Sequence, residues 1–284
     1  CDIENYIESR PDSALTVLEA IDIETLSSNE ERAKYSLYMS MALDKNYIDK
    51  TDFEVLQPAI DYYKNHGSAT DKLRTFYYQG RIYQNGADSE KAMNCFVNAL
   101  ESSVSSDDHI TIARCFYSQG TIYQHMYDWK KVIESNINAS EYFKFSNNVN
   151  SQFRSLLRAI NGYSQLYDTN KASEIILQAN TLLPQVSFAN KGFYYATCIS
   201  FYSDNEMIEE LRSMLSEYIN NIPKERIDWI SVAYAYTILN DYEMANSAIL
   251  NISGDQTTTA RYYALVSDIY RHNNDFKSAL TSYE

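Results

Sequence analysis

Apolar residues recur three and four positions apart along most of this 284-residue chain, with polar residues between them. This spacing places the apolar side chains on one face of an α-helix. No stretch shows the strict alternation of apolar and polar residues that is typical of a half-buried strand. The pattern therefore predicts an all-α protein.

The pattern breaks at short polar turns, which divide the chain into helices of similar length. The predicted helices cover residues 30–46, 58–65, 70–85, 88–103, 110–126, 128–145, 150–167, 170–183, 192–203, 206–221, 226–240, 241–252, 257–272 and 275–284. Before them, the segment from Pro11 to Ile21 predicts the second helix of a pair whose first helix is short or missing. Pro184 and Pro223 follow helices that they would stop. Because no linker or low-complexity stretch interrupts the series, residues 1–284 are predicted to form a single domain.

One stretch of the chain is repeated almost unchanged forty residues later. Residues 76–84 and 116–124 are identical at seven of nine positions. In each copy a glycine, Gly80 or Gly120, falls inside a predicted helix, where glycine costs about 1 kcal/mol relative to alanine. We interpret both glycines as sites where the two helices of one unit cross at close range, which requires a small side chain. Ala233 fills the same place in a later unit.

These units resemble the tetratricopeptide repeat (TPR), a pair of antiparallel helices with large, small and aromatic residues at fixed places. The residues that carry the resemblance are clearest in two units thirty-four residues apart: Trp229, Ala233, Tyr236, Ala245 and Ile249, then Tyr263, Ser267, Tyr270, Ala279 and Tyr283. The resemblance covers almost the whole chain, although the spacing is 39 to 40 residues in the first half. It implies a right-handed α-α superhelix, a TPR-like solenoid of about seven helix-turn-helix repeats, in which each unit buries its apolar face against its neighbours.

The last predicted helix leaves an apolar stripe without a following helix, at Phe276, Ala279, Leu280 and Tyr283. A solenoid normally ends in a helix with a polar outer face. We therefore expect the array to be truncated at its C-terminal end, with more protein beyond Glu284. The alternative is that a partner covers the stripe.

The net charge of −14 is distributed unevenly along the chain. It argues against nucleic-acid binding, which needs clustered lysine and arginine. Residues 71–165 are the exception, with ten basic against nine acidic residues. Here Arg74, Arg114 and Arg154, which we call the arginine series, recur forty residues apart, each near the start of a predicted first helix. The resemblance places this side of the helices on a concave groove, and the same inferred face includes Tyr77, Arg81, Tyr117, Gln124, Asn161 and Gln165.

The arginine series needs an explanation, because a cation in the first turn of a helix opposes the helix dipole by about 0.3 to 1 kcal/mol. One interpretation is a ladder that holds an acidic peptide or its terminal carboxylate through bidentate bonds. The other is that each arginine pairs with a nearby acid such as Glu101 or Asp71, which contributes at most about 1 kcal/mol on a surface. The sequence leaves both interpretations open.

Residues that would carry catalysis or hold a metal or cofactor do not occur at the required spacing. The four histidines form no pair at metal-ligand spacing, there is no Cys-x-x-Cys, and the seven glycines form no phosphate loop. His125, beside the groove position Tyr117, is the one titratable candidate. We therefore predict no enzyme activity, no cofactor and no metal. Cys95, Cys115 and Cys198 are expected to be buried free thiols.

The first residue, Cys1, has two interpretations. It is the residue that carries the lipid after a bacterial lipoprotein signal is removed, or it only marks where this chain begins. Residues 8–15, 44–49 and 61–67 resemble those of bacterial envelope TPR lipoproteins. We therefore expect a periplasmic or outer-membrane location, with membrane attachment only through the lipid or an absent C-terminal segment. Under the second interpretation the location would be cytoplasmic.

Together these features predict a protein-protein interaction scaffold in the bacterial cell envelope. It would bind a partner protein or peptide, with an acidic peptide as one option, in its concave groove, and it could be the sensing part of a longer membrane-anchored regulator. The alternative is a lipid-anchored glycan- or nutrient-binding protein of an outer-membrane uptake system. Such proteins also use TPR helices but carry longer loops. The oligomeric state stays open.

Overall fold

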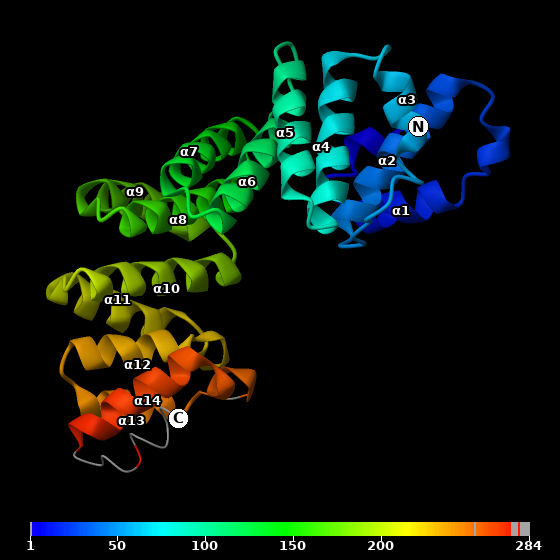
Figure 1. Cartoon of the computed structure of the whole chain (residues 1–284). Helices are drawn as coiled ribbons and strands as arrows, with labels where there is room; N and C mark the ends of the chain where they lie inside the picture. The colour runs from blue at the N-terminus through cyan, green and yellow to red at the C-terminus, as the bar shows by residue number, and fades with distance from the viewer. Residues whose placement is uncertain (1, 253, 274–277, 279–284) are drawn as a thin grey trace. The chain divides into compact units, whose positions relative to one another are not determined.

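The computed structural model describes residues 2–252, 254–273 and 278, and these form helices and short turns (Figure 1). No strand is present in this part of the chain. The α-helices are α1 (Pro11–Glu19), α2 (Asn29–Lys45), α3 (Gln57–Tyr63), α4 (Ala69–Asn85), α5 (Ser89–Ser102), α6 (His109–His125), α7 (Trp129–Phe145), α8 (Val149–Gln165), α9 (Thr169–Leu182), α10 (Phe188–Asp204), α11 (Ile208–Asn221), α12 (Trp229–Ile238), α13 (Tyr242–Ile249) and α14 (Ala260–His272). The 3-10 helices are η1 (Asp2–Asn5), η2 (Ile23–Thr25), η3 (Leu183–Gln185), η4 (Lys224–Arg226) and η5 (Gly254–Thr258).

The predicted helices are confirmed to within a few residues at each end. The largest shift at a helix start is in α10, which begins at Phe188. Pro184 lies in η3 directly after α9, and Pro223 follows α11, so both prolines stand where a helix has ended. The predicted helix 275–284 with its apolar stripe, and Cys1, lie outside the described residues. None of the helices that the structure describes combines the length and apolar character that a membrane span needs.

The helices pack in pairs, as the repeat predicted. Each even-numbered helix from α2 to α12 packs against the helix that follows it, and we call these even-numbered helices, together with α14, the first helices. First helices also contact one another, because α4 packs on α2 and α6, and α10 packs on α8 and α12. We call the surface that they form the first-helix layer.

The chain divides into two compact units, with the boundary between Asn148 and Val149. Unit 1 contains α1 to α7 and unit 2 contains α8 to α14. Each unit has its own main apolar core, the first extending from Ile3 to Ile122 and the second from Phe153 to Ile269. The single domain expected over residues 1–284 stays a prediction.

The turn between the two helices of a pair follows one pattern in four of the pairs. A residue with a left-handed backbone is followed by an aspartate at Ala87-Asp88, Tyr127-Asp128, Tyr167-Asp168 and Asn240-Asp241. The aspartate carboxylate accepts a hydrogen bond from the backbone amide three residues later and so caps the second helix. The left-handed residue ends the first helix and reverses the chain. This turn brings the second helix back alongside the first.

The two repeated glycines lie where the helices of a pair approach closely. A Cβ atom on Gly80 would be 2.6 Å from the ring of Phe96 in α5. A Cβ atom on Gly120 would be 2.6 Å from the side-chain nitrogen of Asn136 in α7. Ala233, at the same place in α12, is completely buried. The prediction of a helix crossing is confirmed at Gly80 and Gly120, and the burial of Ala233 is consistent with it.

Gly80→Ala is expected to destabilise the protein by about 1 to 3 kcal/mol, because the added methyl group overlaps the Phe96 ring. Gly192→Ala in α10 is the matched control, since a Cβ atom there meets no atom within 4 Å. The control should gain up to about 1 kcal/mol of stability from helix propensity. Urea unfolding followed by circular dichroism measures both variants. Equal effects of the two substitutions would contradict the crossing-site assignment.

Candidate functional site

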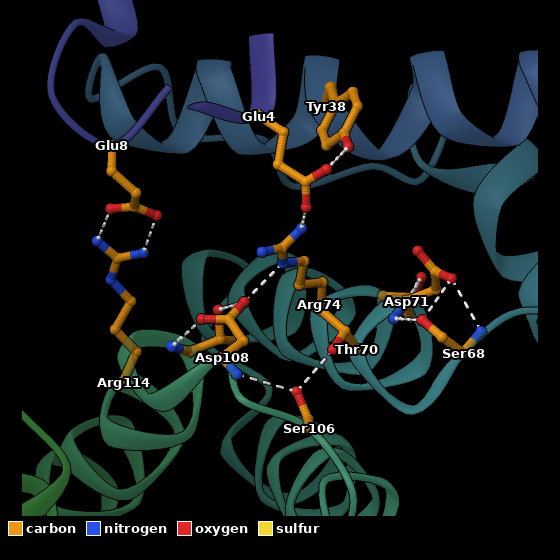
Figure 2. A network of polar contacts seen from close by, with 12 residues as sticks. Glu4, Glu8, Tyr38, Ser68, Thr70, Asp71, Arg74, Ser106, Asp108 and Arg114 are labelled. Carbon is orange, nitrogen blue, oxygen red and sulfur yellow. Dashed lines mark hydrogen bonds and ion pairs between the residues drawn. The ribbon is translucent and has the colours of Figure 1, made fainter. Parts of the chain in front are cut away.

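Two members of the arginine series, Arg74 in α4 and Arg114 in α6, bind carboxylates from the chain's own N-terminus (Figure 2). Arg74 donates from Nη1 to Oε1 of Glu4 at 2.6 Å. Arg114 binds Glu8 in a bidentate manner, its two Nη atoms donating to the two carboxylate oxygens at 3.0 and 2.8 Å. Both acids belong to residues 2–10, which we call the N-terminal segment.

Side chains of α2 complete the binding of these two acids. The hydroxyl of Tyr38 donates to Glu4 at 2.8 Å. The ammonium group of Lys45 lies 2.7 Å from a carboxylate oxygen of Glu8. The N-terminal segment is therefore held by side chains from α2, α4 and α6, which are consecutive first helices of unit 1.

The N-terminal segment itself is coiled into short helical turns. The amides of Ile7 and Arg10 donate to the carbonyls of Ile3 and Tyr6, at 2.9 and 2.8 Å. Residues four apart lie on the same side of such a turn. Ile3 and Ile7 are each 1% exposed and belong to the apolar core of unit 1. The segment is thus anchored by two apolar and two acidic side chains.

The electrostatics of the cluster follow from burial and from the paired charges. Burial alone would raise the pKa of Glu8, but the hydrogen bonds and charge of Arg114, together with Lys45, lower it to about 2. Burial and the charge of Arg114 lower the pKa of Lys45 to about 8, despite the opposing charge of Glu8. The pKa of Arg114 is raised, because Glu8 outweighs the effect of burial. The three groups are therefore mainly charged at neutral pH.

In unit 1 the arginine series pairs with acidic residues of the chain itself. The prediction that Glu101 or Asp71 would be the partner was wrong. Asp71 instead caps the start of α4. The second partner of Arg74 is Asp108, which accepts from its Nε atom at 2.6 Å. The N-terminal partners lie 70 and 106 residues from their arginines, so no local pattern could indicate them.

The other candidate residues of unit 1 do not share one exposed face. Arg81 donates from Nε to Asp44 at 2.9 Å and is thus also paired within the unit. Tyr77 is 5% exposed and packs against aromatic rings of α4 and α5. It is a core residue and not the surface contact that the sequence predicted. Tyr117 is half-buried in α6, and Gln124 is exposed near the end of that helix.

The remaining candidates lie in α8 of unit 2. Arg154 donates from Nε to the amide oxygen of Asn190 at 2.8 Å, and its guanidinium carbon lies 5.9 Å from the ring centre of Phe193. No described carboxylate forms an ion pair with it. Asn161 and Gln165 are exposed. The cluster around the N-terminal segment therefore includes only the unit 1 members of the arginine series.

A groove of about 530 Å³ opens on the first-helix layer of unit 2, lined by residues of α10, α12 and α14. We call it the unit 2 groove. Its lining is apolar at Ile230, Ala264 and Leu265, and Tyr234 adds an aromatic ring. A cavity of this size with a mostly apolar lining and a few polar groups is typical of a ligand site.

Four charged side chains also line the unit 2 groove, and they differ in whether another described residue binds them. Arg271 and Asp268 form an ion pair at 3.1 Å, and Arg261 donates to the hydroxyl of Ser231 at 3.2 Å. Asp204 makes no hydrogen bond or ion pair with any other described residue. Burial raises the pKa of Asp204, and the charge of Arg261 opposes this effect. The groove therefore presents, beside apolar surface, a carboxylate that no described cation binds directly.

Sequence analysis missed the unit 2 groove. Its one local signal is the spacing of Arg261, Asp268 and Arg271, which places three charges on the same side of α14. That spacing is also typical of a solvated helix surface. Only the packing of α14 against α12 shows that these charges border a groove.

No group of three or more histidine, cysteine, aspartate or glutamate side chains in the described ranges could hold a metal ion. His125 is exposed at the end of α6. Cys95, Cys115 and Cys198 are buried free thiols, as predicted. Burial raises the pKa of Cys95 to about 11, which keeps that thiol protonated and unreactive at neutral pH.

Known proteins match this chain in structure but not in sequence. No protein-family model matches it, and no curated protein matches it either. A solved structure of a Rap protein complexed with competence and sporulation factor matches with a TM-score of 0.55 and 12% identity, over 99% of this chain and 93% of that chain. NprR in complex with its cognate peptide NprX matches with a TM-score of 0.51 and 13% identity, over 97% and 86% of the two chains.

The fold is a TPR-like helical-repeat solenoid. The two structural matches extend over nearly the whole chain and, with the helix pairs described above, confirm the predicted all-α fold class.

Glu8→Gln is expected to lower the free energy of unfolding by about 1 to 3 kcal/mol near neutral pH. Arg114 and Lys45 then lose their carboxylate partner. This destabilisation lies between that of breaking an exposed ion pair and that of breaking a buried one, because Glu8 is partly exposed. Since the folded state lowers the pKa of Glu8 to about 2, its contribution is complete above the ordinary glutamate pKa and is lost as the pH falls through 2. Urea unfolding between pH of about 7 and 2 measures this.

The matched control for this experiment is Glu19→Gln in α1, an exposed glutamate with no hydrogen bond or ion pair to another described residue. It should change stability by less than about 0.5 kcal/mol. A difference between wild type and Glu8→Gln that stays constant over the whole pH range would contradict the assigned ion pair.

Proposed function

We propose that this protein is a non-enzymatic scaffold that binds a partner peptide or protein on its first-helix layers, with the unit 2 groove as the open site. The observation that carries the proposal is the groove itself, about 530 Å³ of space lined by apolar and charged residues, with a carboxylate that forms no hydrogen bond or ion pair with any described residue. No covalent chemistry is required of any residue in it. The groove's contribution is shape, apolar contact and charge.

The chemistry of the unit 2 groove favours a peptide with a basic side chain next to an apolar one. The basic group would pair with Asp204, and the apolar group would contact Ile230 and Leu265. Residues 149–284 contain fifteen acidic against ten basic residues, which attracts a basic peptide from a distance. Tyr234 supplies flat contact area of the kind that dominates binding energy at interfaces.

The structural comparisons support a peptide as the ligand class. The Rap protein was solved with competence and sporulation factor, and NprR was solved with its cognate peptide. The shared fold forms an extended face of stacked helices. Because one scaffold can serve unrelated ligands, no residue role is transferred from those proteins to this chain.

We also propose that the protein belongs to the bacterial cell envelope, attached through a lipid on Cys1. The support is the cysteine at this position and the resemblance of residues 8–15 to envelope TPR lipoproteins. In that setting the first-helix layers would be the sensing part of a longer membrane-anchored regulator.

Ala264→Arg is expected to weaken peptide binding at least tenfold, because the large cationic side chain fills the unit 2 groove near Asp204. The ligands are peptides selected on the wild-type protein from a random displayed library, and fluorescence anisotropy measures each affinity on both proteins. The selected peptides should be enriched in lysine or arginine beside an apolar residue.

The matched control is Leu177→Arg, which places the same side chain on an exposed position of α9 outside the groove. It should leave the affinities unchanged. If the selected peptides bind the Ala264→Arg variant as tightly as wild type, or if no peptide is selected at all, the proposed site is wrong.

Intact-mass analysis of protein extracted from native membranes is expected to show Cys1 with added diacylglycerol and acyl groups. A Cys1→Ser precursor should lose this mass and remain in the soluble fraction. An unmodified cysteine at this position in the native protein would refute the proposed lipid attachment and leave the peptide-binding proposal unaffected.

A further inference from the structure

The N-terminal segment contains the dipeptide Ile-Glu twice, and we call each copy a step. Ile3-Glu4 and Ile7-Glu8 lie four residues apart. In both steps the isoleucine is buried in the core of unit 1 and the glutamate binds an arginine. Four residues are about one helical turn, so both steps face the same side of the segment.

Each step is bound by a different repeat of the solenoid. Glu4 binds Arg74 of α4, and Glu8 binds Arg114 of α6 (Figure 2). The two arginines are forty residues apart and occupy equivalent positions in consecutive first helices. Each turn of the N-terminal segment is therefore bound by one repeat of the array.

The surrounding helices place three cations around these carboxylates. The side chains of Lys45, Arg74 and Arg114 are only 8%, 15% and 24% exposed. With residues 2–10 in place these cations have little access to water, so loss of the glutamates from the bound segment is destabilising; Arg74 keeps its bond to Asp108. We call these three cations, with the hydroxyl of Tyr38, the unit 1 carboxylate site. An acidic occupant satisfies it, and a neutral one does not.

The N-terminal segment is attached in the manner of a bound peptide. Among the described residues, its backbone hydrogen bonds run within the segment and into α1, where the amide of Ala14 donates to the carbonyl of Arg10. The side chains of Glu4 and Glu8 make its ion pairs with α2, α4 and α6. These two side chains are 48% and 36% exposed, so the ion pairs lie at the solvent boundary.

We propose that the unit 1 carboxylate site binds peptides that carry two glutamates four residues apart, each preceded by an apolar residue of isoleucine size. In this structure the chain's own N-terminal segment occupies the site, so an external peptide binds in competition with residues 2–10. This second site goes beyond the unit 2 groove of the proposed function. It lies in the other unit and takes a ligand of opposite charge.

Competition with residues 2–10 makes the wild-type chain bind an external peptide weakly. A segment joined to its site by a short connection acts at an effective concentration in the millimolar range. An external ligand sees only the small fraction of molecules whose site is open, and its apparent affinity falls by that fraction. Loosening the segment should therefore increase the affinity for an external peptide.

The test uses a fluorescein-labelled peptide with the sequence of residues 2–10 and the full chain, followed by anisotropy. Glu4→Gln with Glu8→Gln weakens the internal segment but keeps all three cations. This double variant should bind the peptide at least ten times more tightly than wild type does. A control peptide with glutamine at both glutamate positions should not bind. The peptide should also raise the melting temperature of the double variant, because it binds the folded state.

Two results would overturn the proposal. One is a folded double variant that binds the acidic peptide no more tightly than wild type does, and the other is equal binding of the glutamine control. Where the double variant does not fold, Glu4→Gln alone replaces it, since Arg74 keeps its bond to Asp108. The expected gain is then at least threefold, and its absence also overturns the proposal. Adding Ala264→Arg should leave this binding unchanged, so a failure here and a failure at the unit 2 groove are distinguishable.

Discussion

The packing of the two helices of a pair against each other is the constraint on which the structure depends, and it is tightest where α4 crosses α5 and α6 crosses α7. At Gly80 and Gly120 a single hydrogen atom takes the place of a side chain that would collide with Phe96 or Asn136. In these two pairs the apolar faces can meet because both positions stay small. Each pair then presents its first helix to the next pair. The first-helix layers, on which both proposed sites lie, are a product of this repeated crossing.

The two units use the same fold with opposite electrostatic arrangements. Unit 1 encloses cations, above all Lys45 and Arg114, and satisfies them with acids of the N-terminal segment. In unit 2 the carboxylate of Asp204 lines a partly apolar groove and forms no ion pair within the part of the chain that the structure describes. A solenoid sets the spacing of its surface residues but not their chemistry. The two proposed sites, one for an acidic and one for a basic ligand, therefore require no difference in helix packing.

The sequence predicted the helices and their crossings because both depend on local spacing. The apolar period of each helix is visible within one helix, and Gly80 recurs at the same register forty residues later. The sites depend on contacts between distant segments. Nothing near Arg114 indicates that Glu8 is its partner, and Tyr77 has the spacing of a surface residue although its ring lies in the core. The unit 2 groove likewise arises from three helices that only the fold brings together.

The ion pair between Glu8 and Arg114 also affects the order in which unit 1 is completed during synthesis. The two residues are 106 positions apart, so ribosomes release the acid long before its guanidinium partner exists. Helices α2 to α5 can pair locally as they emerge. The contact between residues 2–10 and α6 closes a long loop, whose entropy cost rises only slowly with its length. Such a non-local contact forms later than the local ones. Residues 2–10 thus leave the ribosome well before Arg114 and are among the last parts of unit 1 to be fixed in place.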